Sequence, residues 1–332
     1  MHIRVYGVQA DEMSTYEEAK VRYGFTFEFE AVPLSEKTAG DVKDCDALIL
    51  LTNCIVNEPV AKVLASAGVR YLACRSAGSD HVDYSAVVRY GMKCCHVPAY
   101  APEAISEHTI MLALEVLRHA KSSYQKVASG DFTLKGLKGR QLGMMTAGVL
   151  GTGRIGRVTM SLLKGFGTRV LGWDPFPNAE AARLCTYVEK ETLLQTSDII
   201  FLHCPLTEDS YHTICSDTLS KMKEGAVLIN TARGGLVDLP AVLDALESRK
   251  LSGFGFDVYE HETDTIRKQV PLDDIHDPVF RALLQRDDTV YSAHVAFYTD
   301  TAILNMIEVT LDNLKEYEAT GCCKNEINPQ SF

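Results

Sequence analysis

The stretch Val149-Leu150-Gly151-Thr152-Gly153-Arg154-Ile155-Gly156 places three glycines at the spacing Gly-x-Gly-x-x-Gly. The apolar run before it predicts a β-strand, and the residues from Arg154 onward predict a helix. In such a turn, Gly151 permits the sharp bend, Gly153 lets the backbone approach a phosphate, and Gly156 lets helix and strand pack closely. The N–H groups at the start of the helix, those of Arg154 and Ile155, would then face a pyrophosphate.

A second apolar run, residues 169–173, ends on Asp174, about 20 residues after the glycines. An acid at this distance accepts hydrogen bonds from the adenosine ribose hydroxyls and repels a 2′-phosphate. Asp174 could also be an ordinary surface acid, but a strand before, a helix after and an acid at the expected distance favour the first interpretation. The sequence therefore predicts a dinucleotide site that takes NAD rather than NADP.

The bulk composition is that of a globular protein large enough for two domains. The chain has 332 residues, of which 46% are hydrophobic and 23% charged, and its formal net charge is −11. Because that charge repels phosphate backbones and anionic lipid, nucleic acid and membrane are not expected as partners. No apolar run is long enough to cross a bilayer, and the first residues resemble a strand rather than a signal peptide. We expect a cytoplasmic protein.

The ten cysteines show no Cys-x-x-Cys spacing. Cys94-Cys95 and Cys322-Cys323 are adjacent pairs with poor geometry for a disulfide. Cys45, Cys74 and Cys204 lie in or beside apolar strands, where a free thiol behaves as a small hydrophobe. Free thiols in a reducing compartment are expected, and a metal site is the less favoured alternative because no ligand spacing supports it.

Strand and helix signals alternate along most of the chain, which predicts parallel sheets with helices on their faces. A segment rich in proline, residues 98–102, separates two such units, and a long helix is expected over residues 103–120. Predicted strands cover residues 3–6, 25–29, 47–51, 70–74, 147–150, 169–173, 199–202, 226–230, 253–256 and 289–291. A ligand is expected at the carboxyl ends of the strands, in a cleft between the two domains.

Three polar residues that follow the later strands could carry a reaction on a 2-keto acid. Arg233 offers a planar fork for a carboxylate, and His294 could donate a proton to a carbonyl oxygen. Glu262 could fix the tautomer of that histidine and favour its charged form. Each could instead be a structural residue, but their joint occurrence after a nucleotide fingerprint favours catalysis.

Seven blocks, spread over nearly the whole length, have the form of a family signature: residues 75–83, 98–102, 149–156, 203–207, 230–238, 257–260 and 293–299. In these blocks the chain resembles the D-2-hydroxyacid dehydrogenases, and most closely the D-lactate and D-2-hydroxyisocaproate branch.

The family's architecture implies a discontinuous substrate domain of flavodoxin-like fold, residues 1–100 plus 298–332. A Rossmann domain for NAD would span residues 101–297, with helix 103–120 as the contact of a homodimer.

The family's site residues can be carried over one by one. Arg233 would bind the substrate carboxylate, and His294 would be the acid/base paired with Glu262. The backbone N–H groups of Ala77 and Gly78 would also hold the carboxylate. Asp257 would bind the nicotinamide carboxamide or support the site from behind. Further cofactor contacts would come from His203, Pro205 and Ala232.

Two departures from the family pattern stand beside the site. Ala293 precedes His294 where the family most often has Pro, so the turn should be less rigid. Cys204 replaces a more usual small or β-branched residue beside the cofactor. It would pack as a small hydrophobe, or less favourably act as a reactive thiol.

The substrate side chain is expected to be apolar. Leu51 stands where the related 2-hydroxyglutarate enzymes carry an Arg for a second carboxylate, and a buried carboxylate without a cation is costly. Tyr100, Phe297 and Tyr298 suggest a partly aromatic wall. Pyruvate, branched 2-keto acids and phenylpyruvate all remain open.

The resulting hypothesis is a cytoplasmic homodimer that reduces 2-keto acids to D-2-hydroxy acids with NADH. One alternative is an NADH-sensing scaffold of the corepressor type, which the family also contains. Another is a related enzyme that acts on 2-hydroxyglutarate, phosphoglycerate or glyoxylate.

Overall fold

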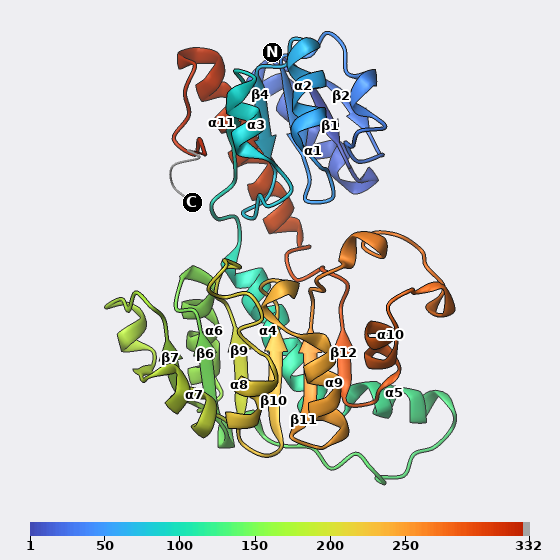
Figure 1. Ribbon diagram of the computed structural model, residues 1–332, viewed down its shortest axis with the longest axis vertical. Coiled ribbons are helices and arrows are strands. Elements are labelled where there is room, and N and C mark those ends of the chain that lie inside the picture. Colours follow the sequence, from blue (N-terminus) through green and yellow to red (C-terminus); the bar gives the residue numbers. More distant parts are fainter. Residues whose placement is uncertain (328–332) are drawn as a thin grey trace. The chain divides into compact units, whose positions relative to one another are not determined.

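The computed structural model describes residues 1–327, apart from the side chains of Asp11 and Thr263. The chain divides into two compact units. Unit 1 comprises Met1–Ala101 and the segment from Tyr298 onward, and unit 2 comprises Pro102–Phe297. The last five residues of the predicted segment 298–332 lie outside the described part. Both units are α/β layers built on parallel sheets, as the sequence predicts (Figure 1).

In the described part of unit 1, the sheet has the strand order β2-β1-β3-β4-β5 and is parallel throughout. This is the doubly wound order of flavodoxin-like folds. Its strands are β1 (His2–Tyr6), β2 (Thr26–Glu30), β3 (Ala47–Leu50), β4 (Tyr71–Cys74) and β5 (Lys93–Cys95). Its helices are α1 (Met13–Tyr23), α2 (Glu58–Ser66), α3 (Tyr84–Arg89) and α11 (Asp300–Thr320).

Alternation along the strands of unit 1 feeds two cores. Ile49 faces a core shared with α1 and α11, whereas its neighbours Leu48 and Leu50 face a core shared with α2 and α3. Strands buried on both faces need near-continuous apolar sequence, which is why Ala47–Leu50 was recognisable. The segment from Tyr298 onward thus returns to complete the fold of the first hundred residues.

In the described part of unit 2, the sheet has the order β12-β11-β10-β9-β6-β7-β8, the extended Rossmann order, and is parallel. The strands are β6 (Thr146–Leu150), β7 (Arg169–Trp173), β8 (Thr186–Tyr187), β9 (Ile199–Leu202), β10 (Ala226–Asn230), β11 (Leu251–Phe256) and β12 (Thr289–Tyr291). The helices are α4 (Pro102–Leu117), α5 (Ala120–Ala128), α6 (Arg154–Gly165), α7 (Lys190–Thr196), α8 (Ser216–Lys221), α9 (Leu239–Glu247) and α10 (Pro278–Gln285).

The helix predicted over residues 103–120 is shorter than expected. It ends at Leu117, and His119 has a left-handed backbone with φ +50° before α5 begins. Much of its apolar surface lies inside unit 2, against α6 and the sheet. Gly253 and Gly255 make this packing possible, because a Cβ at Gly253 would meet Val116 at 2.3 Å.

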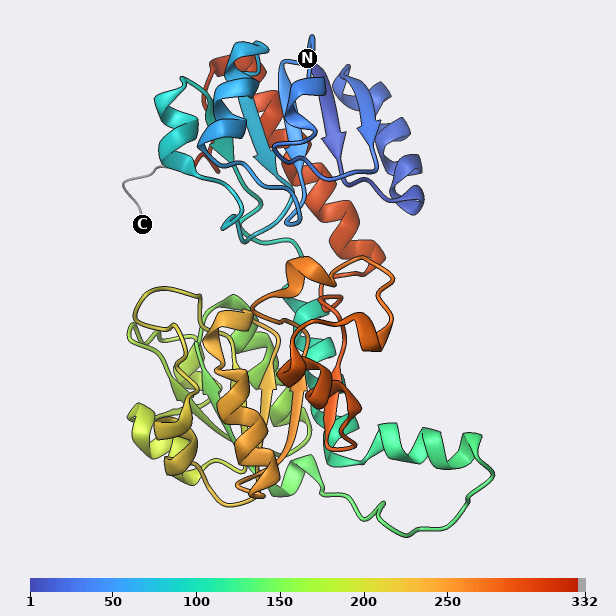
Figure 2. The same ribbon diagram turned by 45° about the vertical axis from the view of Figure 1, so that its right-hand side comes forward.

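The following arm, α5 and the loop to β6, extends from the body of unit 2 (Figure 2). No residue of α5 is buried, and the sequence did not predict this helix. Lys121 anchors its first turn by donating to the carbonyls of Leu284, Arg286 and Thr289. The arm therefore has a fixed start and an exposed remainder.

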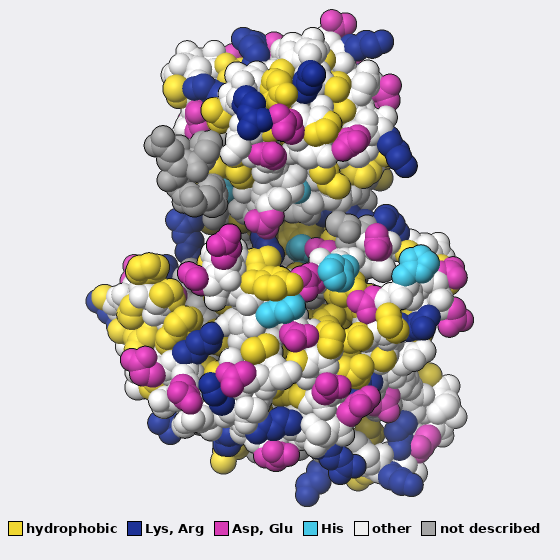
Figure 3. Space-filling view, in the orientation of Figure 1, with side chains coloured by type: hydrophobic (Ala, Val, Ile, Leu, Met, Phe, Trp, Pro, Cys, Tyr) yellow, Lys and Arg dark blue, Asp and Glu magenta, His cyan; other side chains and the backbone are white. Residues whose placement is uncertain are grey.

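Acidic and basic side chains are interspersed over the face drawn in Figure 3. Among the described residues, no helix has the length and apolarity needed to span a bilayer. All ten cysteines are free thiols, and no cluster of metal-ligand side chains occurs within the described part.

Candidate active site

The glycine loop at the carboxyl end of β6 has the shape that a phosphate needs. Gly151 has φ +95°, and a Cβ there would lie 2.4 Å from the backbone of His203. Gly156 is equally close to the loop, because a Cβ there would lie 2.2 Å from the carbonyl oxygen of Gly151. In contrast, a Cβ on Gly153 would meet nothing within 4 Å. The loop is therefore closed on two sides and open at Gly153, where α6 begins and its first N–H groups have no side-chain cap.

Asp174 at the end of β7 is bonded to this loop. Its Oδ2 accepts hydrogen bonds from the Thr152 N–H at 2.7 Å and the Thr152 hydroxyl at 3.1 Å. Its Oδ1 accepts from the Phe176 N–H at 2.9 Å. The acid is half-buried and held in one orientation beside the loop. Together, an open glycine loop, an uncapped helix start and a fixed acid fit the pyrophosphate and ribose of NAD.

The other expected cofactor residues differ in how their side chains lie. The imidazole of His203 points into unit 2, with Nε2 2.9 Å from the Thr159 hydroxyl. Burial lowers the pKa of His203 to about 4, so this ring is neutral at physiological pH. Pro205 is exposed and Ala232 is half-buried, beside the same sheet edge. Burial raises the pKa of the Cys204 thiol, which agrees with packing rather than reactivity.

Arg233, Glu262 and His294 follow three strands that are neighbours in the sheet, β10, β11 and β12. Because the strands are parallel, all three residues belong to the same carboxyl edge. His294 Nδ1 and Glu262 Oε1 are 2.7 Å apart, and both side chains are 20% exposed. The second oxygen of Glu262 accepts from the Tyr259 N–H at 3.2 Å. The carboxylate thus fixes one ring nitrogen and leaves the other for a ligand.

The loop that carries Arg233 is shaped by Asn230. The Asn230 side chain accepts from the Ala232 N–H at 3.0 Å and donates to the Arg233 carbonyl at 2.9 Å. Gly234 lies so close to the segment after β11 that a Cβ would meet the Glu260 nitrogen at 2.2 Å. The sequence reasoning missed Asn230, although an Asn at a strand end, three residues before an Arg, is a recognisable turn signal.

Asp257 supports the turn that carries His294. This carboxylate is 1% exposed and accepts from the Ser292 hydroxyl, the Val295 N–H and the Ala296 N–H, at 2.6, 2.9 and 3.0 Å. Of the two roles that the resemblance left open for Asp257, these bonds favour support of the site from behind. Ser292 was not identified from the sequence.

The backbone of this turn is strained. Ala293 and His294 have φ +54° and +58°, a left-handed region that costs about 1–2 kcal/mol per non-glycine residue. A proline could not stand at position 293, because its ring fixes φ near −65°. Alanine can adopt the left-handed conformation at this cost, and the hydrogen bonds to Asp257 hold the turn there. That the turn is less rigid stays a prediction.

The expected substrate residues of unit 1 follow its strands. Leu51 is only 5% exposed, beside Gly7. Two carbonyl contacts fix the loop of Ala77 and Gly78. The Gly78 carbonyl accepts a hydrogen bond from the Ser76 hydroxyl at 2.6 Å, and the Ala77 carbonyl lies 3.0 Å from His96 Nδ1. The N–H groups of this pair make no hydrogen bond to any residue that the structure describes.

Three aromatic residues were also expected at the substrate. Tyr100 is half-buried, and its carbonyl accepts from the Asn305 side chain at 2.6 Å. The Phe297 ring, at the end of unit 2, meets that of His294 edge-on with centroids 6.2 Å apart. Tyr298, where the chain re-enters unit 1, is 44% exposed.

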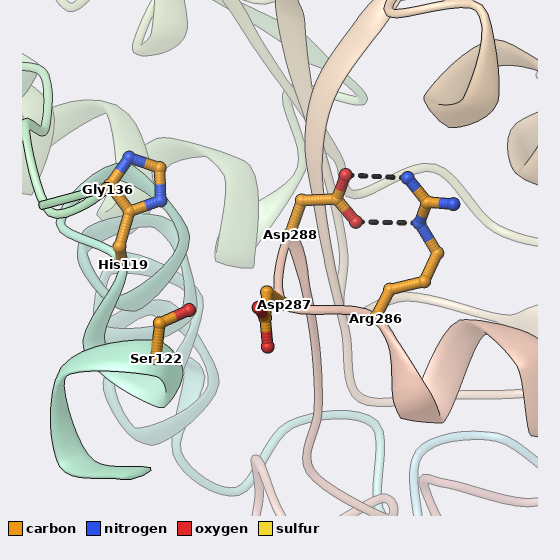
Figure 4. Close-up of a pocket in the computed structure, with 6 residues that line it drawn as sticks. All are labelled: His119, Ser122, Gly136, Arg286, Asp287 and Asp288. Atoms are coloured by element: carbon orange, nitrogen blue, oxygen red, sulfur yellow. Dashed lines mark hydrogen bonds and ion pairs between the residues drawn. The ribbon is translucent and has the colours of Figure 1, made fainter. Parts of the chain in front are cut away.

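A pocket of about 490 Å³ lies elsewhere in unit 2 (Figure 4). It includes the paired side chains of Arg286 and Asp288, bonded at 2.7 and 2.8 Å. Because Asp288 precedes β12 and His294 follows it, this pocket belongs to the opposite edge of the sheet. It is not part of the Arg233–His294 site.

Residues 110–296 match the family model described as the NAD binding domain of D-isomer specific 2-hydroxyacid dehydrogenases. The chain belongs to this family. As a D-2-hydroxyacid dehydrogenase, it is an NAD-dependent oxidoreductase that reduces 2-keto acids to D-2-hydroxy acids, and the resemblance noted in the sequence is confirmed.

Three relatives illustrate the match of this dehydrogenase over its full length. D-lactate dehydrogenase of Escherichia coli is 38% identical over 328 residues, covering 98% of this chain and all of that protein. An aromatic 2-oxoacid reductase of Clostridium sporogenes is 36% identical, covering 98% and 99%. The solved structure of a D-2-hydroxyisocaproate dehydrogenase has a TM-score of 0.89 at 35% identity, covering 98% and 99%.

Proposed function

We propose that this dehydrogenase reduces monocarboxylic 2-keto acids with an apolar side chain, using Arg233, Glu262 and His294. The observation that carries the proposal is the 2.7 Å contact between His294 Nδ1 and Glu262 Oε1, on the sheet edge that also bears Arg233. When bound at the glycine loop, NADH supplies the hydride for the keto carbon. We assign the neighbouring contacts of the cofactor to Arg154, Ile155, Asp174, His203, Pro205 and Ala232.

His294 supplies the proton. With Nδ1 directed at Glu262, the protonated ring presents Nε2–H to the substrate and donates it to the carbonyl oxygen as the alcohol forms. The imidazole is neutral after this step and regains its proton from solvent. The Glu262 carboxylate keeps the ring in this orientation through its contact with Nδ1.

Arg233 anchors the substrate by its carboxylate, for which the guanidinium fork is geometrically suited. From unit 1, we propose that the backbone N–H groups of Ala77 and Gly78 bind the same carboxylate. Their fixed carbonyls support this role, because a rigid loop presents its N–H groups without an ordering cost.

The preference for an apolar side chain rests on Leu51, Tyr100, Phe297 and Tyr298, which we assign to the substrate. None offers a cation for a second carboxylate. The relatives named D-lactate dehydrogenase and aromatic 2-oxoacid reductase agree with pyruvate and phenylpyruvate as substrates.

The test is a panel of pyruvate, 2-ketoisocaproate, phenylpyruvate and 2-ketoglutarate, assayed with NADH and repeated with NADPH. We expect oxidation of NADH with the first three and little with 2-ketoglutarate. Comparable kcat/KM for 2-ketoglutarate would contradict the apolar pocket. No oxidation with any 2-keto acid, despite NADH binding, would favour a dinucleotide-sensing scaffold.

Glu262→Gln tests the pairing with His294. An amide holds Nδ1 of His294 less firmly than the carboxylate does, so the ring should be aimed less well and kcat for reduction should fall about 10- to 100-fold. The measurement is kcat for 2-keto acid reduction, with the Kd of NADH as the control that should stay unchanged. An unchanged kcat would remove Glu262 from the dyad.

We further propose a cytoplasmic homodimer, with the contact centred on α5 and the following loop rather than on helix 103–120 alone. This arm exposes Tyr124, Val127, Phe132 and Leu134, at 68%, 54%, 79% and 86%. Several large apolar side chains exposed on one arm favour a partner, and most oligomers are symmetric. Light scattering should give a dimer for the parent chain and a monomer for Phe132→Asp/Leu134→Asp. A monomeric parent would refute it.

A further inference from the structure

The turn that carries His294 is held in place by one buried carboxylate, that of Asp257. Asp257 accepts hydrogen bonds from the residues on either side of His294, through the Ser292 hydroxyl at 2.6 Å and the Val295 N–H at 2.9 Å. The carbonyl of Asp257 also accepts from the His294 N–H, at 2.5 Å. Because Ala293 and His294 are both left-handed, these bonds are what opposes relaxation of the turn.

Helix α4 extends this network with a residue that the mechanism does not use. His108 is half-buried on α4, and its Nε2 lies 2.8 Å from the Ser292 hydroxyl and 3.5 Å from Asp257 Oδ1. A carboxylate only accepts hydrogen bonds, so the Ser292 hydroxyl spends its one proton on Asp257. Its oxygen must then accept from His108, which places the imidazole proton on Nε2.

The electrostatic setting agrees with a neutral donor. Burial lowers the pKa of His108, and the opposing influence of the Asp257 and Glu115 carboxylates does not reverse this. A neutral imidazole with Nε2–H can donate to Ser292 without placing a second charge beside Asp257. The chain His108–Ser292–Asp257 is therefore directional, from α4 to the turn.

We propose that His108 and Ser292 are positioning residues for His294. They fix the rotamer of Asp257, and Asp257 fixes the left-handed turn that aims the His294 ring. This proposal rests on the proposed role of His294 as the proton donor. It assigns α4, which otherwise packs against α6 and the sheet, a second role as the support of the catalytic turn.

Paired variants at two positions test the proposal. Ser292→Ala and His108→Leu break the chain of hydrogen bonds, whereas Ser292→Thr keeps a hydroxyl and His108→Gln keeps a side-chain N–H donor of similar reach. We expect kcat for 2-keto acid reduction to fall about 10- to 100-fold in the first pair, the effect of a reacting group displaced by a fraction of an ångström to an ångström. KM and the Kd of NADH should stay within about twofold, because Arg233 and the glycine loop are untouched.

The second pair should recover most of the lost kcat. The double variant Ser292→Ala/His108→Leu should be no slower than the slower single variant, because the two groups act in series. The matched control is Ser252→Ala, which removes a hydroxyl bonded to the Gly225 carbonyl at 2.7 Å, near the start of the neighbouring strand β11. Its kcat should equal that of the parent.

The outcomes separate this proposal from the proposed function. Full kcat in Ser292→Ala and His108→Leu, with a nearly inactive His294→Gln, overturns positioning and leaves the function intact. An active His294→Gln overturns the function itself. Loss of kcat and Tm together, without recovery in the conservative variants, would assign the two residues to folding alone and overturn the proposal.

Discussion

The carboxyl edges of the two sheets are built on opposite plans. In unit 2, the edge presents ionisable side chains, with Arg233, Glu262 and His294 on neighbouring strands. In unit 1, Arg75, which directly follows β4, forms an ion pair with Glu12 in which both side chains are only 1% exposed. A sheet edge can therefore serve chemistry by its side chains, or by holding a backbone rigid.

The largest effect is expected at the side-chain edge. His294→Gln keeps a hydrogen-bonding side chain but cannot carry the proton, so kcat for reduction should fall about 10²- to 10⁴-fold. NADH binding should be unchanged, as measured by fluorescence of the single tryptophan, Trp173, at the end of β7. A normal kcat in this variant would contradict the view that the side chains at the edge of the unit 2 sheet carry the chemistry.

The buried ion pair of unit 1 should matter for stability instead. Glu12→Gln leaves Arg75 without a carboxylate among Tyr16 and other buried groups, and should cost about 3–5 kcal/mol of unfolding free energy. Urea denaturation of the full chain measures this loss of stability. The control is the double variant Glu12→Leu/Arg75→Met, which removes both charges and should be much closer to the parent. Equal losses in the two variants would show that packing, not the unpaired charge, is responsible.

A backbone substitution in unit 2 should have a smaller effect. Gly234→Ala forces a Cβ into the Glu260 backbone and should cost about 1–3 kcal/mol, with a rise in KM because the Arg233 loop shifts. Gly165→Ala, whose Cβ would meet nothing within 4 Å at the end of α6, is the matched control and should be neutral or stabilising. Similar KM values for both variants would contradict the tight contact.

The last effect, of similar size, concerns pH. Because burial lowers the pKa of His203 from 6.5 to about 4, the unfolded chain binds a proton between these values and the folded chain does not. Stability should therefore fall on acidification through this window, by an order of 1–3 kcal/mol from this residue. His203→Asn does not titrate there, so its stability deficit relative to the parent should shrink as the pH falls from 6.5 to 4. A constant deficit would mean that the His203 ring protonates as readily as in the unfolded chain.

The sequence was informative where burial is two-sided. Strands such as Ile199–Leu202 and Ala226–Asn230 were predicted with the bounds that the structure has, because both faces are apolar. The end of α4 was not, since a left-handed His119 leaves no pattern in composition. Helix α5 was missed because it is only nine residues long and its apolar residues, Tyr124 and Val127 among them, bury nothing in this chain.

For the site, residues with distinctive chemistry could be found and their supports could not. Arg233, Glu262 and His294 were selected from the sequence because few residue types can perform their roles. Ser292 and His108 are 184 positions apart and meet only through the packing of α4 on the sheet. Their contact depends on the tertiary fold, so no local sequence pattern predicts it.

The bonds of Asp174 bear on any attempt to redesign cofactor preference. Replacing this acid by a neutral or basic residue would remove a repulsive charge, but it would also strip the Thr152 and Phe176 N–H groups of their acceptor. The glycine loop would therefore lose the hydrogen bonds that fix it, although it would have to bind a bulkier cofactor. An engineer who wants an NADPH-dependent variant must therefore supply a substitute acceptor together with the new cation.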